Sequence, residues 1–229
     1  MNCFPNILCA LANCIFLCNV LLGTVQAEIP PAPPFTNGSG DPAMNGMKHA
    51  GVAFTGTGIE VHLAESPPSP VVMTPSGGRD FTPDKFDVLE QGYFNGQHGW
   101  LPEGVFNGLP QGASIWIQRT GASQPPGAAF HVYEGGNMTQ GMDTWTMQEV
   151  YADGTPWQWD GLMQHDYFVV DRPGQYSMSF DVYVGDSQGI PWSGLSAGST
   201  TLSFVAVPEP TALFSVLLGG LMLRGRRRR

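Results

Sequence analysis

The chain has 229 residues, and its 19 acidic against 10 basic residues give a formal net charge of −9. The stretch 28–206 is more acidic still, with 18 acidic and five basic residues, because five arginines lie in the last six positions. A surface of this charge repels nucleic acid and anionic lipid, so we exclude nucleic-acid binding. All four cysteines fall within the first 18 residues, so the stretch 28–206 forms neither disulfides nor cysteine-ligated zinc sites.

Residues 1–27 have the pattern of a signal peptide. An almost uninterrupted apolar stretch covers residues 7–23, and small residues of the kind that a signal peptidase accepts precede Glu28. No Lys or Arg stands before the apolar stretch, which departs from the usual pattern. We expect an N-terminal signal helix, cleavage by signal peptidase after Ala27, and an exported mature protein.

Residues 28–48 are rich in Pro, Gly, Asn and Ser, which predicts a flexible lead-in. Residues 49–206 then alternate short apolar runs with Gly and Pro clusters, and no helical period is present. The clearest strand covers residues 175–184, where every second residue from Tyr176 to Val184 is apolar. Further short strands are predicted at residues 52–54, 59–63, 114–118, 129–134, 157–159 and 199–206.

The turns between these strands complete the predicted architecture. Gly56, Thr57 and Gly58 join the first two strands in a hairpin, and the proline-rich stretch 66–75 reads as a surface loop. Strands this short, in a chain with 30 glycines and 20 prolines, favour an all-β fold. We therefore predict one antiparallel β-sandwich domain at residues 49–206.

The last 23 residues fall into three parts. The motif Val207, Pro208, Glu209 and Pro210 comes first, an apolar run follows at 211–223, and Arg224, Gly225, Arg226, Arg227, Arg228 and Arg229 end the chain. As a helix the thirteen apolar residues rise about 20 Å, short of the roughly 20 residues that a stable membrane span needs. The arginines favour a cytoplasmic end. This pattern predicts a short transmembrane helix that retains the chain temporarily.

These three parts in this order resemble the PEP-CTERM sorting signal of exported bacterial proteins. The resemblance implies processing by an exosortase, with residues 211–223 in the membrane beforehand and the product in the cell envelope or extracellular matrix afterwards. An ordinary tail anchor is the alternative interpretation of the same residues.

Gly194, Leu195, Ser196, Ala197 and Gly198 match the G-x-S-x-G pattern of a hydrolase nucleophile elbow. That motif needs a helix after the serine, whereas residues 199–204 read as a strand. We therefore expect a turn here and no enzyme, and a hydrolase that uses Ser196 remains the last alternative. Asp153 with Gly154 likewise resembles a turn and lacks the regular spacing of a calcium loop.

Three of the five histidines are candidate metal ligands. His49 opens the first strand region, His62 lies on the polar face of the next strand, and His165 precedes the long strand. Neutral imidazole is the commonest nitrogen ligand of zinc, and three histidines with a water or carboxylate complete a tetrahedral site. From the residues alone, solvent-facing histidines are the other interpretation.

A second resemblance covers residues 49–204. It rests on the order of three loose motifs. The first is His49, the turn at 56–58 and His62, and the second is the stretch 106–118, which runs from Phe106 to a strand with Trp116. The third is His165 and Phe168, followed by Gly174, Gln175 and Tyr176. These resemble choice-of-anchor M domains, which are bacterial surface-anchored β-sandwich domains, and their relatives under zinc-responsive repression. The resemblance implies a cell-surface zinc or other divalent metal bound by His49, His62 and His165. A member that kept the fold and lost the metal is the alternative.

Tryptophans suggest a different ligand. Trp157 and Trp159 share one face of a predicted strand, where two indoles could stack a sugar ring, although core packing is the usual role of such residues. We thus expect a non-catalytic exported envelope or matrix protein that binds a divalent metal, with a carbohydrate-binding matrix component, in contact with exopolysaccharide, as the alternative.

Overall fold

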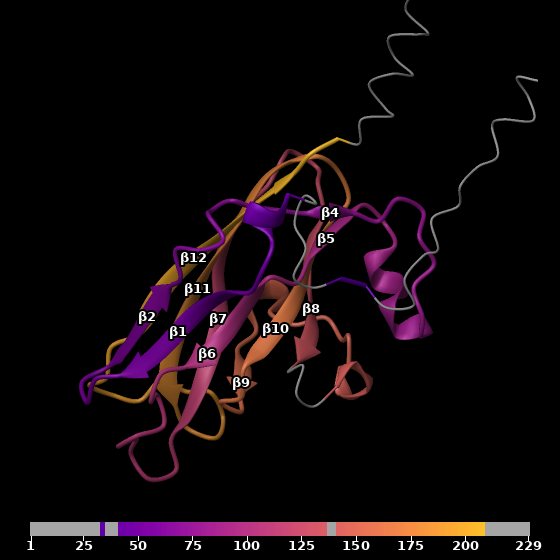
Figure 1. The fold of residues 1–229 in the computed structure, drawn as a ribbon. Helices are drawn as coiled ribbons and strands as arrows, with labels where there is room; N and C mark the ends of the chain where they lie inside the picture. Colours follow the sequence, from indigo (N-terminus) through magenta and orange to yellow (C-terminus); the bar gives the residue numbers. More distant parts are fainter. Residues whose placement is uncertain (1–32, 35–40, 137–140, 209–229) are drawn as a thin grey trace, which may run out of the picture. The chain divides into compact units, whose positions relative to one another are not determined.

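The computed structural model describes residues 33–34, 41–136 and 141–208. The predicted signal helix at 1–27 and the sorting segment from Glu209 onward lie outside these residues. Within the described part of the chain, no helix has both the length and the apolar character that a membrane crossing requires. The fold is mostly β-sheet, and its strands form two sheets (Figure 1).

The first sheet has seven strands in the order β2-β1-β6-β10-β5-β4, and β8 pairs with the other side of β10. Their bounds are β1 (Lys48–Phe54), β2 (Ile59–Leu63), β4 (Thr74–Pro75), β5 (Tyr93–Asn95), β6 (His98–Pro102), β8 (Phe130–Gly136) and β10 (Gln164–Val170). β1 and β6 run parallel, while the other pairs are antiparallel. The first hairpin is confirmed, since Phe54 pairs with Ile59 across the predicted turn.

The second sheet has five strands in the order β3-β12-β11-β7-β9. Their bounds are β3 (Val71–Val72), β7 (Ser114–Ser123), β9 (Trp157–Trp159), β11 (Gly174–Gly185) and β12 (Gly198–Ala206). β3 pairs with β12 in parallel. Both sheets are therefore mixed, and the expectation of a purely antiparallel fold was wrong. Long connections separate the two strands of each parallel pair, which gives the chain room to cross over.

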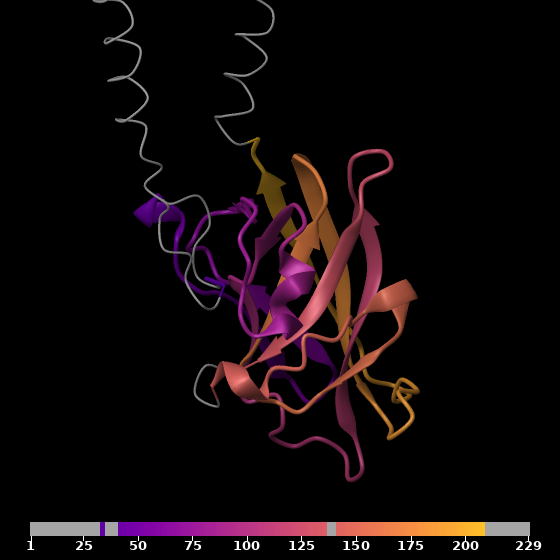
Figure 2. The same cartoon turned by 90° about the vertical axis from the view of Figure 1, so that its right-hand side faces the viewer.

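The two sheets pack face to face (Figures 1 and 2) around one large aromatic core. Trp100 of β6 meets Phe180 of β11 at a ring-centroid distance of 5.5 Å. Phe168 of β10 meets Phe204 of β12 at 4.6 Å. The alternation predicted for the long strand is confirmed, because the apolar face of β11 is buried throughout this core.

A smaller apolar cluster covers the opposite face of the first sheet. Phe86 and Leu89 of the short helix η2 (Asp84–Leu89) belong to it, together with Tyr167 and Val169 of β10. Every residue of β10 is consequently buried. A strand that is covered on both faces has no polar and apolar alternation, which explains why the sequence did not reveal β10 as a strand.

The proline-rich stretch 66–75 departs from the predicted surface loop. It contains β3 and β4, and Val71 is completely buried. Buried Lys48 fastens the same stretch, because its ammonium group donates 2.5 Å hydrogen bonds to the carbonyls of Ala64 and Pro67. The stretch therefore connects the two sheets at one end of the core.

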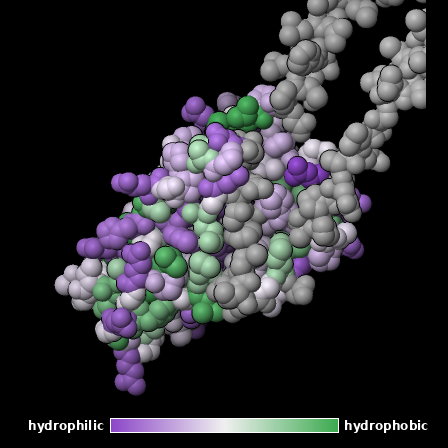
Figure 3. Space-filling model, in the orientation of Figure 1, coloured by the Kyte–Doolittle hydropathy of each residue, from purple (hydrophilic) through white to green (hydrophobic). Residues whose placement is uncertain are grey.

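Hydrophilic residues dominate the face of the molecule in Figure 3, and the apolar residues there form small groups that hydrophilic residues interrupt. The large apolar side chains that are well exposed lie far apart in the sequence, at Met47, Phe106, Leu162, Ile190 and Val207. Separate apolar residues of this kind are normal on a protein surface. The face shown offers no broad apolar area for docking.

Replacing Phe180 by Ala tests the assignment of the core. Phe180 is fully buried between the sheets, so we expect Phe180→Ala to lower the free energy of unfolding by about 3–5 kcal/mol. Urea denaturation followed by tryptophan fluorescence measures the change. Thr201→Ala, at an exposed position on the same sheet, should cost no more than about 0.5 kcal/mol. Equal losses for the two variants would contradict this packing.

Candidate functional site

Two of the three predicted metal ligands meet on the outer face of the first sheet. His49 of β1 and His165 of β10 both pair with Gly99 of β6, so the three residues form one row across three strands. The two imidazole rings lie edge to face at a centroid distance of 5.5 Å. A Cβ atom on Gly99 would stand 2.5 Å from Nε2 of His165, so only glycine leaves room for this ring.

Burial keeps both of these histidines neutral. It lowers the pKa of His165 to about 4, and the Nδ1 atom of this ring lies 3.0 Å from the carbonyl oxygen of Gly96. Burial also lowers the pKa of His49, although nearby Glu103 acts in the opposite direction. Nε2 of His49 is buried and has no hydrogen-bond partner within the described structure. Neutral imidazole is the form that binds metals.

His62 does not join this pair. It lies on β2, opposite Gly51 of β1. Its side chain is 65 % exposed, and its Nε2 stands 3.5 Å from a carboxylate oxygen of Glu60. Over residues 41–136 and 141–208, no group of three His, Cys, Asp or Glu side chains is arranged to hold a metal ion. The structure thus brings His49 and His165 together and leaves His62 at the surface, so these three do not fit a zinc site as they stand.

His98, which the sequence analysis did not single out, is a core residue. It lies between the sheets with its ring centroid 5.0 Å from that of Phe204, and burial lowers its pKa to about 3. A neutral imidazole in this position acts as a polar member of the aromatic core.

The two tryptophans proposed as a sugar platform do share one face of β9, but that face points into the core. Trp159 is only 2 % exposed, and its indole nitrogen donates a hydrogen bond to the carbonyl of Leu162. Trp157 is partly buried against the same core and packs edge-on against Tyr151. These positions leave no pair of open ring faces on which a sugar could stack.

Ser196 lies in a turn that is fastened to the first hairpin. Its backbone N–H donates to Thr57, and its carbonyl accepts a hydrogen bond from Ile59. The strand β12 begins two residues later, as predicted, where a nucleophile elbow would need a helix.

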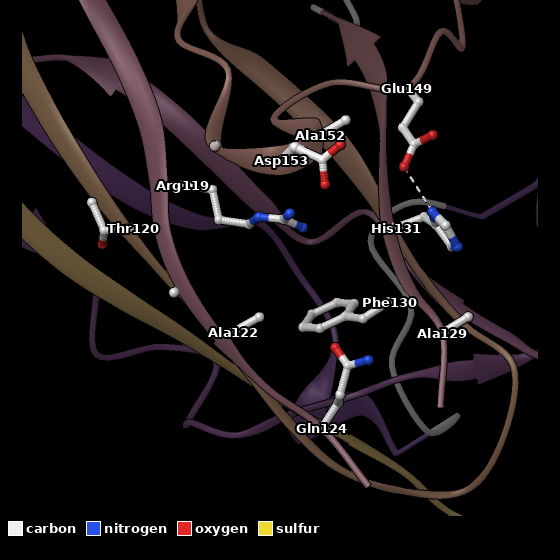
Figure 4. A pocket seen from close by; sticks show the side chains of 12 residues that line it. Arg119, Thr120, Ala122, Gln124, Ala129, Phe130, His131, Glu149, Ala152 and Asp153 are labelled. Carbon is white, nitrogen blue, oxygen red and sulfur yellow. Dashed lines mark hydrogen bonds and ion pairs between the residues drawn. The ribbon is translucent and has the colours of Figure 1, made fainter. Parts of the chain in front are cut away.

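A groove opens at the edge of the sandwich, between β7 of the second sheet and β8 of the first (Figure 4). We call it the β7–β8 groove; its volume is about 630 Å³. β9 pairs with β7 only along Ile115–Ile117. After Ile117, no strand among the described residues pairs with this edge of β7, while β11 pairs with the opposite edge. The groove is lined by Arg119, Thr120, Gly121, Ala122, Gln124, Ala129, Phe130, His131, Glu149, Ala152, Asp153 and Gly154.

The change from core to groove takes place along β7. Ile115 and Ile117 face inward and are fully buried, and the next inward position is Arg119, which pairs with Phe180. A β-bulge then leaves Thr120 without an opposite residue. The extra residue shifts the alternation, so Ala122 and not Gly121 faces inward. Figure 4 shows Arg119, Ala122 and Gln124 pointing from this side into the groove.

The second wall of the groove is built from a strained segment. Met147, Tyr151 and Asp153 all have φ angles between 49° and 59°, which non-glycine residues rarely adopt. Three such residues within seven positions require strong support from their surroundings. The short helix η5 (Ala152–Gly154) carries Asp153, and the carbonyl of Gly154 accepts a hydrogen bond from the Gln118 amide.

A buried polar network supplies this support. The hydroxyl of Tyr151 donates to a carboxylate oxygen of Asp166 at 3.0 Å and accepts from the indole of Trp100 at 3.2 Å. The Gln164 amide donates to the other oxygen of Asp166 at 2.9 Å, and the N–H of Gly135 lies 3.3 Å from it. Burial raises the pKa of Asp166 to about 6, while these hydrogen bonds act in the opposite direction. The network fixes Tyr151 and with it the start of η5.

At the rim of the groove, His131 and Glu149 are joined by a hydrogen bond, with 2.7 Å between Nδ1 and a carboxylate oxygen. Both side chains are 44 % exposed. The groove therefore presents guanidinium, amide, imidazole and carboxylate groups within a small space, and this set can exchange several hydrogen bonds with a polar ligand.

No sequence pattern predicted this groove as a site, although one of its residues carries a signal. Ile115 and Ile117 are alternate residues of an apolar strand, and the next residue in this alternation is Arg119. The pattern therefore predicts a charged side chain that faces inward at the end of the strand. The bulge at Thr120, in contrast, has no sequence signal, so Gln124 could not be found in this way.

No protein-family model matches the chain, and no curated protein matches it either. The resemblances to PEP-CTERM proteins and to choice-of-anchor M domains therefore stay predictions.

The buried Asp166 predicts a pH dependence of stability. Its pKa rises from an ordinary 3.8 to about 6, so between these values the unfolded chain has released a proton that the folded chain keeps. The free energy of unfolding should fall as the pH rises through this window. Each pKa unit corresponds to about 1.4 kcal/mol, so the loss should be about 3 kcal/mol.

Urea denaturation of the wild type and of Asp166→Asn at pH 4 and pH 7 measures this effect. We expect the wild type to lose about 2 kcal/mol more than the variant between the two pH values, because at pH 4 the unfolded carboxyl has already lost more than half of its protons. Asp84→Asn, at an exposed position, should behave like the wild type. A wild type and an Asp166→Asn variant with the same pH dependence would show that Asp166 does not titrate in this way.

Proposed function

We propose that the chain is an exported, non-catalytic protein of the cell envelope or extracellular matrix, and that residues 207–229 sort it. The observation that carries the proposal is the junction between the domain and the motif. β12 ends at Ala206, and Val207, the first residue of the motif, is 52 % exposed. The last strand of the described structure thus ends where the proposed sorting motif begins.

This junction suits proteolytic processing. A peptidase needs an extended and accessible segment, and proline removes the N–H that would continue strand pairing. Cleavage after Val207 would leave every strand of both sheets intact, because each of them lies within residues 48–206. The domain can then remain folded while the exosortase, the partner that the motif implies, removes the apolar run 211–223.

The folded part supports a binding role over catalysis. Ser196, the one nominal nucleophile of the sequence, is held in a turn by backbone hydrogen bonds. The β7–β8 groove instead offers side chains suited to hydrogen bonding.

Replacing Arg226, Arg227, Arg228 and Arg229 by alanine tests the sorting proposal. With Arg224 as the one positive charge left of five, the preference of the apolar run for a cytoplasmic end is weakened, so retention and cleavage should fail. The full chain is expressed in a bacterium with an exosortase, and the intact mass of the product in each cell fraction is measured. We expect a shortened product for the wild type and none for the alanine variant.

Replacing the same four arginines by lysine is the matched control, because it keeps the charge. This variant should mature largely like the wild type. If the alanine variant also matures like the wild type, the tail is not a sorting signal of this kind.

Divalent metal binding is a second candidate function, and one observation favours it: the contact between the neutral rings of His49 and His165. Two imidazoles are half of a tetrahedral zinc site. Zinc titration of the full chain by calorimetry tests this candidate. If it is correct, one Zn²⁺ should bind per chain, and His49→Ala should weaken binding at least about tenfold because one of two nitrogen ligands is lost.

His131→Ala is the control for this titration, since His131 lies on β8 and forms an exposed hydrogen bond with Glu149. It should leave zinc binding unchanged. Zinc binding that survives His49→Ala, or no binding to the wild type, would reject the metal function and leave the pair as packing residues.

A further inference from the structure

We propose that the β7–β8 groove binds a short stretch of a neutral saccharide chain. This inference goes beyond export and sorting, and it assigns the recognition site to residues different from Trp157 and Trp159. The geometry that points to it is the row of inward-facing polar side chains at the open edge of the sandwich (Figure 4).

The side chains of the groove have the chemistry that sugar hydroxyls need. The guanidinium of Arg119 offers several donors in one plane, and the carboxylate of Asp153 offers two acceptor oxygens. The amide of Gln124 donates one N–H to the carbonyl of Ala128 and still offers its oxygen and its second N–H. A hydroxyl group donates one hydrogen bond and accepts others, so neighbouring hydroxyls on a sugar can engage such groups in pairs. Phe130 lies at the floor of the groove (Figure 4), where only a small part of its ring, 6 % of the residue, is exposed, and the methyl groups of Ala122 and Ala129 complete the apolar lining.

Charge argues against anionic ligands. The carboxylates of Glu149 and Asp153 outnumber the one guanidinium in the groove, and the stretch 28–206 has a net charge of −13. Phosphate groups and anionic polysaccharides would be repelled. A purely apolar ligand would bury the polar groups of the groove without hydrogen bonds, which is costly. A neutral ligand rich in hydroxyls avoids the charge repulsion and also gives the polar groups of the groove hydrogen-bond partners.

The groove is also preorganised. On one wall the bulge at Thr120 sets the direction of Ala122, and on the other the Asp166 network holds Tyr151 and the strained turn with Asp153. Strained backbone of this kind persists only where the surroundings enforce it, and such residues cluster at ligand sites. Side chains that are fixed before binding lose less entropy when a ligand arrives.

The two ends of the groove limit the length of the ligand. Gln124 and Ala129 line one end at the loop between β7 and β8, and Ala152, Asp153 and Gly154 of η5 line the other (Figure 4). The inward-facing wall between Arg119 and Gln124 spans five residue steps, about 17 Å in an extended strand. A chain end or a few sugar residues fit this space better than a long stretch of polymer.

An array of neutral and anionic oligosaccharides, probed with the fluorescently labelled full chain in detergent, tests the proposal. We expect binding to neutral glycans and none to anionic ones. The dissociation constant for the best neutral oligosaccharide is then measured by calorimetry. Arg119→Ala and Asp153→Asn should each raise it at least tenfold; asparagine tolerates the positive φ angle of this position.

A third variant blocks the groove without removing a polar group. Ala122 is exposed and faces inward, so Ala122→Trp should fill the space and abolish binding while the melting temperature stays close to that of the wild type. Arg79→Ala and Asp84→Asn, matched changes outside the groove, should bind like the wild type.

Three results would overturn the proposal: an array without any neutral hit, a strongest hit that is anionic, or an affinity that all three groove variants leave unchanged. Binding is measured on the purified chain and does not depend on processing. A failure of saccharide binding is therefore distinguishable from a failure of the sorting proposal.

Discussion

The enclosure of β10 is the constraint on which the rest of this structure depends. β10 pairs with β6 and β5 along one edge and with β8 along the other, and apolar clusters cover both of its faces. A strand in this position has no access to water, so each polar side chain that it carries needs partners inside the protein. Asp166 receives three hydrogen bonds, and His165 is neutral above the gap that Gly99 provides.

This enclosure extends to the surface through Tyr151. The tyrosine reaches into the core to satisfy Asp166, and its backbone therefore adopts a left-handed conformation at the start of η5. The same turn carries Asp153 to the groove. A requirement of the core thus determines the position of a surface carboxylate. Loss of the hydrogen bond between Tyr151 and Asp166 would disturb the wall of the groove, although neither residue lines the groove.

The sequence predicted those parts of the fold in which one face of a strand is buried. Period-two alternation identified β11, and the turn around Thr57 identified the first hairpin. It failed for β10, which is covered on both faces, and for the parallel pairing of β1 with β6, which depends on long-range packing. Of the candidate site, sequence could identify His49 and His165 as histidines near strands, but their contact across Gly99 arises only from register. The groove depends on a bulge and a strained turn, and neither has a pattern in the sequence.

The groove and the proposed sorting tail share one end of the sandwich. Gly174 pairs with Ala206, the last residue of β12, and Pro125 of the β7–β8 loop occupies the space beside Gly174. The closed loop end of the groove is therefore near the exit of the chain at Val207, while η5 lies toward the other end. A tail that holds the chain at the membrane, as proposed, would keep that loop end close to the membrane. The proposed processing and the proposed saccharide binding would therefore act on adjacent parts of the same domain.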